Sequence, residues 1–117
     1  MRFSREHRIR KSGEFERLRK EGRWIPGRHF HLQVGERGCA PSRLGLAVSR
    51  RVGPAVVRNR IKRRFRALFR AVAPELRTPL DIVVIARKGV DRVSFSDLKR
   101  DFLHSLRFWH SHSPRSE

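Results

Sequence analysis

Apolar residues recur along this chain with two different periods, and each change of period marks a new predicted element. In residues 30–34 and again in residues 44–48 apolar and polar positions alternate, a pattern typical of half-buried β-strands. The connection between them, residues 35–42, contains two glycines and a proline, and its length predicts an antiparallel hairpin. The preceding residues 23–27 turn the chain and could add a short edge strand.

Three other segments carry apolar residues at spacings of three and four, which predicts amphipathic helices. The first follows Ser12, a good N-cap, and stops at Gly22. The second follows the Gly-Pro pair at 53–54, and its apolar stripe is Val57, Ile61, Phe65, Leu68, Phe69 and Val72. The third follows Ser94, with Asp97 as a capping-box partner. Its stripe, expected in the core, is Phe95, Leu98, Phe102, Leu106 and Trp109.

Residues 81–87 have apolar side chains on both faces, which indicates a strand in the interior of a sheet. The predicted order is therefore α-β-β-α-β-α in one small domain of the α+β class, with a small mixed sheet packed against helices. Strand, helix and strand around residues 44–87 form a crossover unit. We expect a basic arm at residues 1–11, the folded domain at 12–109 and a flexible tail at 110–117.

On the face opposite the apolar positions, the two predicted hairpin strands carry small or polar side chains, which have little apolar surface to bury. It presents His29, His31 and Gln33 on one strand and Arg43, Gly45, Ala47 and Ser49 on the other. An ordinary solvated sheet face explains this pattern. The floor of a groove, where small residues let a ligand approach the backbone, explains it as well. The charge next to this face favours the groove.

The charge of the chain narrows its possible partners. It contains 29 Lys and Arg against 11 Asp and Glu, a formal net charge of +18 in 117 residues. Nine of the basic residues lie between Arg50 and Arg70, and no acidic residue occurs between Glu36 and Glu75. A folded protein relieves such self-repulsion by binding a polyanion, either nucleic acid or anionic membrane. Arginine greatly outnumbers lysine, which favours structured RNA because guanidinium groups bind phosphate and stack on bases.

On the second predicted helix the basic residues lie opposite the apolar stripe. Asn59, Arg63, Arg66 and Arg70 follow one another at spacings of four, three and four, and Arg60, Arg64 and Lys62 flank them. A solvated charged helix face usually mixes signs to form i,i+4 pairs, and this helix has no acid to pair with. The pattern therefore indicates contact with nucleic acid. Arg58 falls on the apolar side in the first turn, where its side chain can reach the groove.

The residues indicate no catalytic centre. The acids are scattered, so neither a set of metal-binding carboxylates nor a general acid–base pair is evident. His29 and His31 have no further ligand type near them and are a weak signal for a metal. Cys39 is the single cysteine, which fits a reducing cytosol. A polar N-terminus and the absence of a membrane-length apolar run predict a soluble cytoplasmic protein.

Two adjacent motifs connect the chain to a known family. Residues 45–53 read Gly-Leu-Ala-Val-Ser-Arg-Arg-Val-Gly, and residues 55–63 contain Arg58-Asn59-Arg60 on the basic helix. Together they resemble the signature of the bacterial ribonuclease P protein subunit, and the similarity covers residues 5–109. The resemblance implies a protein that binds a large catalytic RNA and helps it remove the 5′ leader of precursor tRNA, with Mg²⁺ held mainly by the RNA. It also implies an unusual left-handed βαβ crossover.

The resemblance carries binding roles onto positions of this chain. It implies contact with the RNA subunit by Arg50, Arg51, Arg60, Lys62, Arg63, Arg66 and Arg70. It implies a leader cleft lined by Phe15, His31, Gln33, Ala47, Ser49, Arg58 and Asn59. Gln33 stands where an aromatic residue is frequent, Ala47 where some members have Ser, and Arg19 where some have Phe. Stacking on a leader base should therefore be weaker here and electrostatic attraction more prominent.

The residues alone leave three function classes open. A ribonuclease P subunit would be an accessory to an endoribonuclease, without a catalytic residue or a metal of its own. A structural RNA-binding protein of ribosomal type explains the charge but not the Arg-Asn-Arg helix. An autonomous nuclease lacks the acids that it needs. For Phe15, an ordinary core position is the alternative to a cleft role. We expect no membrane and no obligate protein partner.

Overall fold

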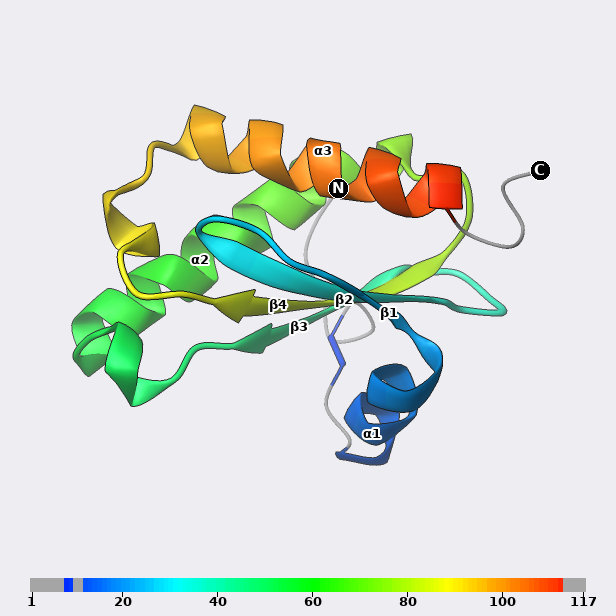
Figure 1. Cartoon of the computed structure of the whole chain (residues 1–117), viewed down its shortest axis with the longest axis horizontal. Coiled ribbons are helices and arrows are strands. Elements are labelled where there is room, and N and C mark those ends of the chain that lie inside the picture. The colour runs from blue at the N-terminus through cyan, green and yellow to red at the C-terminus, as the bar shows by residue number, and fades with distance from the viewer. Residues whose placement is uncertain (1–7, 10–11, 113–117) are drawn as a thin grey trace.

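One four-stranded mixed sheet separates two unequal layers of helices in the computed structural model, which describes residues 8–9 and 12–112 (Figure 1). The helices are α1 (Ser12–Glu21), α2 (Ala55–Val72) and α3 (Phe95–His112). The strands are β1 (Arg23–Ile25), β2 (Phe30–Glu36), β3 (Arg43–Ala47) and β4 (Leu80–Ala86). Short 3₁₀ turns occupy Arg50–Val52, Ala73–Glu75 and Val90–Arg92. The predicted helices and strands are confirmed, including the short edge strand β1.

The predicted hairpin between β2 and β3 is wrong, because β4 lies between them. The strand order is β1-β2-β4-β3, with β4 antiparallel to β2 and parallel to β3. The two strands do run in opposite directions, but they share no ladder. Helices cover both faces of this sheet, so the strand that is apolar on both faces takes one of its two interior positions, beside β2. That strand is β4, in which every side chain is buried except that of Ile85, which is half-buried.

The main hydrophobic core lies between the sheet and the layer formed by α2 and α3 (Figure 1). It contains the predicted stripe of α2 from Ile61 to Val72 and, on α3, Leu98, Phe102, Leu106 and Trp109. Phe95 is a correction, because 40% of it is exposed. Phe95 is the first residue of α3, and helical side chains lean toward the N-terminus of their helix. Its ring therefore extends beyond the end of α3 and is only partly covered by the sheet.

Gly22 follows the last residue of α1 as predicted, whereas Ser12, the predicted N-cap, is itself the first residue of α1. The Ser94 hydroxyl accepts a hydrogen bond from the Asp97 N–H at 3.2 Å, which caps α3. Helix α3 continues to His112, through the first three residues of the predicted tail. Of the predicted basic arm, only residues 8–9 are described. Arg8 forms an isolated parallel bridge with Leu44, and the Ile9 N–H donates to the Leu44 carbonyl at 3.0 Å.

Candidate RNA-binding site

Most cations of helix α2 lie on its solvent-facing side, where no described acidic side chain pairs with them. Arg60, Arg63 and Arg70 are exposed with Asn59, and Lys62 and Arg66 are half-buried. Within the described part of the chain, no basic residue of α2 forms a salt bridge, whereas arginines of α1, β3 and α3 do. The outward face of α2 is therefore free to bind several phosphates.

Two arginines of α2 are used inside the protein. Arg58 Nε donates to the Gly53 carbonyl at 3.2 Å, so this half-buried side chain stays at the turn before α2. Arg64 donates to the carbonyls of Asp91 and Val93 and thereby fastens α2 to the turn before α3. Arg50 and Arg51 lie in the 3₁₀ turn that precedes α2 and are exposed. They extend the basic surface of α2 toward the end of β3.

The opposite face of the sheet is organised in three rows that cross β2, β4 and β3. The pairing register defines the first row as Gly35, Asp81 and Arg43, the second as Gln33, Val83 and Gly45, and the third as His31, Ile85 and Ala47. Helix α1 packs against this face (Figure 1). The three rows differ in what covers them, and this decides which of the predicted cleft residues a ligand can reach.

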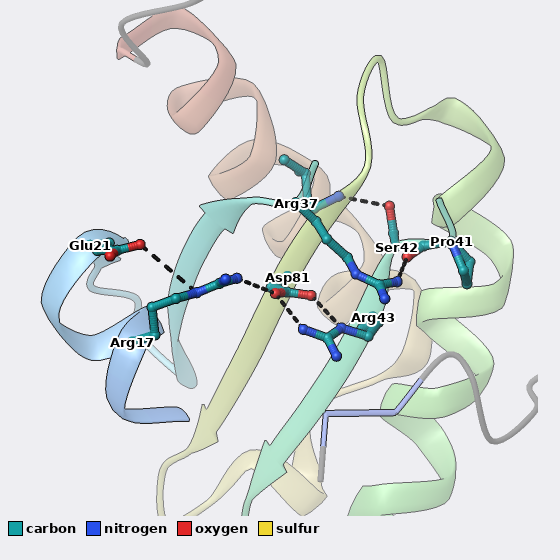
Figure 2. Close-up of polar contacts among 8 residues, drawn as sticks. Arg17, Glu21, Arg37, Pro41, Ser42, Arg43 and Asp81 are labelled. Atoms are coloured by element: carbon teal, nitrogen blue, oxygen red, sulfur yellow. Dashed lines mark hydrogen bonds and ion pairs between the residues drawn. The ribbon is translucent and has the colours of Figure 1, made fainter. Parts of the chain in front are cut away.

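The first row holds a buried ion pair that is also contacted by α1 (Figure 2). Asp81 is 3% exposed, and Arg43 Nε and Nη2 each donate to one of its carboxylate oxygens at 2.8 Å. Arg17 Nη2 of α1 lies 3.5 Å from Asp81 Oδ2 and also pairs with Glu21. Because one carboxylate contacts both β3 and α1, it ties the helix to the strand that carries Ala47.

The second row is covered by α1. A Cβ atom on Gly45 would lie 3.0 Å from two ring atoms of Phe15 and 3.2 Å from Val83 Cγ2. The missing side chain of Gly45 thus makes room for Phe15 of the same chain rather than for a ligand, which corrects our interpretation of that position. Gln33 Nε2 donates to the Leu18 carbonyl at 3.0 Å and so caps the end of α1. Little of this row is left for a ligand.

The third row is the accessible part of the face. Ala47 and the following Ser49 are exposed, and His31 and Ile85 are half-buried. His31 Nδ1 accepts a hydrogen bond from the Gly27 N–H at 3.1 Å. Burial, and then the nearby Arg87 guanidinium, lower the pKa of His31 below its usual value of 6.5, which favours a neutral ring at pH 7. A strand laid here would meet small residues and one neutral hydrogen-bonding ring.

Phe15 lies between the two candidate surfaces. It is half-buried and packs in a second hydrophobic cluster with Ile9, Leu18, Val83 and Ile85. It also lines a hollow of about 200 Å³ at the edge of β3, whose other side is formed by Lys62 and Arg66 of α2. Burial, and then Arg8, lower the pKa of Arg66. Arg8 and Arg66 thus line the same hollow as the ring of Phe15.

Comparison with known proteins agrees with this arrangement. A model of the ribonuclease P family matches residues 3–109. The ribonuclease P protein component of Streptococcus mutans is 39% identical to this chain over 101 residues, which cover 86% of this chain and 84% of that protein. The ribonuclease P protein component of Shouchella clausii is 42% identical over 106 residues, which cover 90% of this chain and 87% of that protein. This chain belongs to the bacterial ribonuclease P protein family.

Solved structures of ribonuclease P proteins share the fold described above. The protein from Staphylococcus aureus superposes with a TM-score of 0.77 at 31% identity, covering 87% of this chain and 94% of its own. The protein from Thermotoga maritima also has a TM-score of 0.77, at 33% identity, covering 86% and 96%. The predicted family and fold class are thereby confirmed.

Among residues 8–9 and 12–112, no three His, Cys, Asp or Glu side chains are grouped so that they could hold a metal ion. His29 and His31 therefore have no third ligand in this part of the chain. None of the helices in the same part is long and apolar enough to cross a membrane.

Sequence reasoning missed two residues beside the third row. Trp24 of β1 is 49% exposed, and its ring centroid lies 4.8 Å from that of His31. Arg87, directly after β4, is exposed and lies close enough to His31 to lower the pKa of the imidazole. Trp24 falls in a segment that the pattern described as a turn. Its alternation with the buried Ile25 was the signal that could have placed it on this face.

Proposed function

We propose that this ribonuclease P protein binds the catalytic RNA subunit through α2 and the turn before it. Arg60, Arg63 and Arg70 contact its phosphates, with Lys62, Arg66, Arg50 and Arg51 extending the same surface. The 5′ leader of precursor tRNA lies over the third row, between Ser49 and His31. The complex removes the leader in the cytoplasm and produces the mature 5′ end.

The absence of intramolecular counter-charges on α2 carries the assignment to the RNA subunit. Exposed arginines of a folded protein commonly find acids at i±3 or i±4, as Arg17 and Arg19 of α1 and Arg100 of α3 do here. The arginines of α2 have no such partner among the described residues. A polyphosphate backbone would supply the missing charge, and the helix shape allows several contacts along one face.

The third row suits a single strand rather than a duplex. Ala47 and Ser49 are small, so the ribose-phosphate backbone can approach the sheet. Phe15 stands at one side, and Arg58 and Asn59 at the start of α2 supply polar contacts near the end of β3. An aromatic residue with several hydrogen-bonding groups and cations favours binding that tolerates many sequences.

We assign cleavage chemistry to the RNA subunit and to Mg²⁺ held mainly by it. The described residues do not fit a magnesium site of the protein's own, because no group of carboxylates or histidines comes together. Asp81 is the buried acid nearest the proposed site, and it is already occupied by Arg43. The role left to the protein is to bind and position two RNAs.

Reconstitution tests this function directly. Precursor tRNA is incubated with Mg²⁺ and either the protein, the RNA subunit, or both, and the 5′ product is identified by its length. We expect efficient removal of the leader only with both components. A structural RNA-binding protein of ribosomal type would bind the RNA without increasing cleavage. Cleavage by rigorously RNA-free protein would contradict the proposal.

A further inference from the structure

We propose that Trp24, His31 and Arg87 form a binding site for one unpaired nucleotide at the β1 edge of the sheet. The base stacks on the Trp24 indole, the His31 ring donates a hydrogen bond, and Arg87 contacts the phosphate. The inference rests on the proposed function for the identity of the strand, the 5′ leader of precursor tRNA. It extends that site by one contact beyond the third row.

Trp24 faces the same side of the sheet as the third row. It pairs with Gln33 in the β1–β2 register, and directly opposed residues of antiparallel strands lie on one face. The neighbouring Arg23 lies on the other face, where its guanidinium carbon is 5.7 Å from the centre of the Phe108 ring of α3. A single exposed aromatic residue needs no explanation by itself. Its two polar neighbours make this one a candidate site.

His31 is held in an orientation that leaves one donor available. Its Nδ1 accepts the Gly27 N–H at 3.1 Å, so the proton of the neutral ring resides on Nε2. The rings of His31 and Trp24 are inclined by 39° with their centroids 4.8 Å apart. The contact limits the movement of the indole. A rotamer fixed in advance loses less entropy when a base stacks on it.

Arg87 is anchored by one end of its guanidinium. Its Nη1 donates to the Gly27 carbonyl at 3.0 Å and to the Arg28 carbonyl at 3.2 Å. The side chain is exposed, and its Nε and Nη2 can still donate to a phosphate. The same loop that orients His31 through the Gly27 N–H thus positions Arg87 through the Gly27 carbonyl. The loop thus presents the hydrogen-bonding His31 ring and the Arg87 guanidinium together.

The location fits a strand that crosses the sheet. In the order β1-β2-β4-β3, three inter-strand spacings of about 4.8 Å separate β1 from β3, or about 14 Å in total. A leader that passes Ala47, Ile85 and His31 therefore comes within reach of Trp24, which pairs with Gln33 in the neighbouring second row and contacts the His31 ring. Only an unpaired base can lie flat on the indole, since the faces of paired bases are stacked inside a helix. The ligand class is single-stranded RNA.

Tryptophan fluorescence tests the site in the free protein. The chain has two Trp, and Trp109 is 5% exposed. A Trp109→Phe variant reports on Trp24 alone and is titrated with a single-stranded oligoribonucleotide and with the same sequence as a duplex. We expect saturable quenching by the single strand and little by the duplex. Equal quenching by both, or none, would overturn the proposal.

Binding of precursor tRNA to the assembled holoenzyme tests its functional role. Stacking of one base is worth about 1–3 kcal/mol, so Trp24→Leu should weaken precursor affinity about fivefold or more, and Trp24→Phe should retain most of it. Mature tRNA affinity and RNA-subunit assembly should not change. Phe95→Leu is the matched control, because Phe95 is 40% exposed on α3, in the layer on the other face.

The outcomes separate this inference from the proposed function. If wild-type protein supports leader removal but Trp24→Leu binds precursor as tightly as wild type, the nucleotide site is wrong and the proposed function stands. Equal losses for precursor and mature tRNA would assign Trp24 to assembly or to folding, and would also overturn the site. If wild-type protein does not support leader removal at all, the proposed function fails, whatever the fluorescence shows.

Discussion

Arg43 and Asp81 are directly opposed on the parallel strands β3 and β4 and form a bidentate ion pair with two 2.8 Å hydrogen bonds. The side chain of Arg43 is 13% exposed and that of Asp81 4%. Arg17 of α1 approaches the same carboxylate to 3.5 Å (Figure 2). The pair is therefore part of the core on the α1 face. Phe15, two residues before Arg17, lies over Gly45 on the same face.

Asp81→Asn should strongly destabilise the protein, because it removes the carboxylate charge that pairs with the buried Arg43 guanidinium. We expect the free energy of unfolding in urea to fall by about 3–5 kcal/mol. Arg17→Ala should cost less than about 1 kcal/mol, since that side chain is 54% exposed and solvent screens the pair. Similar losses in the two variants would show that the buried pair is not the dominant contact.

Gly45→Ala should disturb Phe15. The new Cβ atom would lie 3.0 Å from two Phe15 ring atoms, so α1 must shift, and we expect a loss of about 1–3 kcal/mol in the free energy of unfolding. Gly38→Ala is the control, because nothing lies within 4 Å of a Cβ atom at that position. If both variants melt like wild type, α1 does not pack as closely on β3 as described.

Replacing Arg60, Arg63 and Arg66 with Ala should weaken assembly with the RNA subunit and reduce its dependence on salt. Three lost phosphate contacts lower the slope of log K against log salt by about two to three. The control removes the same charge outside α2, with Ala at the exposed Arg92, Arg100 and Arg107. A slope that falls equally in both triple variants would show only a non-specific effect of net charge.

His31 should titrate below its usual pKa of 6.5, because burial and Arg87 both disfavour the charged ring. The folded state then binds fewer protons than the unfolded state, so His31 contributes stability above pH 6.5 that is lost as the pH falls through its folded pKa. NMR titration of the imidazole measures this directly. Arg87→Ala should raise the pKa of His31, and Arg100→Ala, on α3, should not. A pKa at or above 6.5 in wild type would contradict the described packing.

Local periodicity was sufficient to predict the helices and strands but not the neighbours of each strand. The alternation in β2 and β3 and the length of their connection are compatible with a hairpin, and they say nothing of a third strand that separates the two. The same limit applies to the Arg43–Asp81 pair, whose members are 38 residues apart in the chain. Neither residue has a local pattern that reveals its partner.

The candidate site was predicted in outline and differs in detail for physical reasons. Gly45 and Gln33 belong to the predicted polar face. Helix α1 covers Gly45, and the Gln33 side chain caps the end of α1. How a helix docks on a sheet depends on contacts distant in sequence, so the pattern could not show this. Ala47, Ser49 and His31 remain accessible to different degrees. Trp24, directly across from Gln33, adds an aromatic side chain that the pattern did not assign to this face.

The central claim is that α2 and the third row bind different RNAs, and Ala47→Phe tests it most directly. The new ring would cover the exposed end of the third row without removing a charge, and Ala40→Phe, in the exposed loop at the opposite end of β3, is the control. Affinities of the holoenzyme for precursor and mature tRNA are measured together. We expect Ala47→Phe to weaken precursor binding by about tenfold, or about 1.4 kcal/mol, and to leave mature tRNA binding and RNA-subunit assembly unchanged. Equal losses for both tRNAs, or no loss in a variant that still folds, would contradict it.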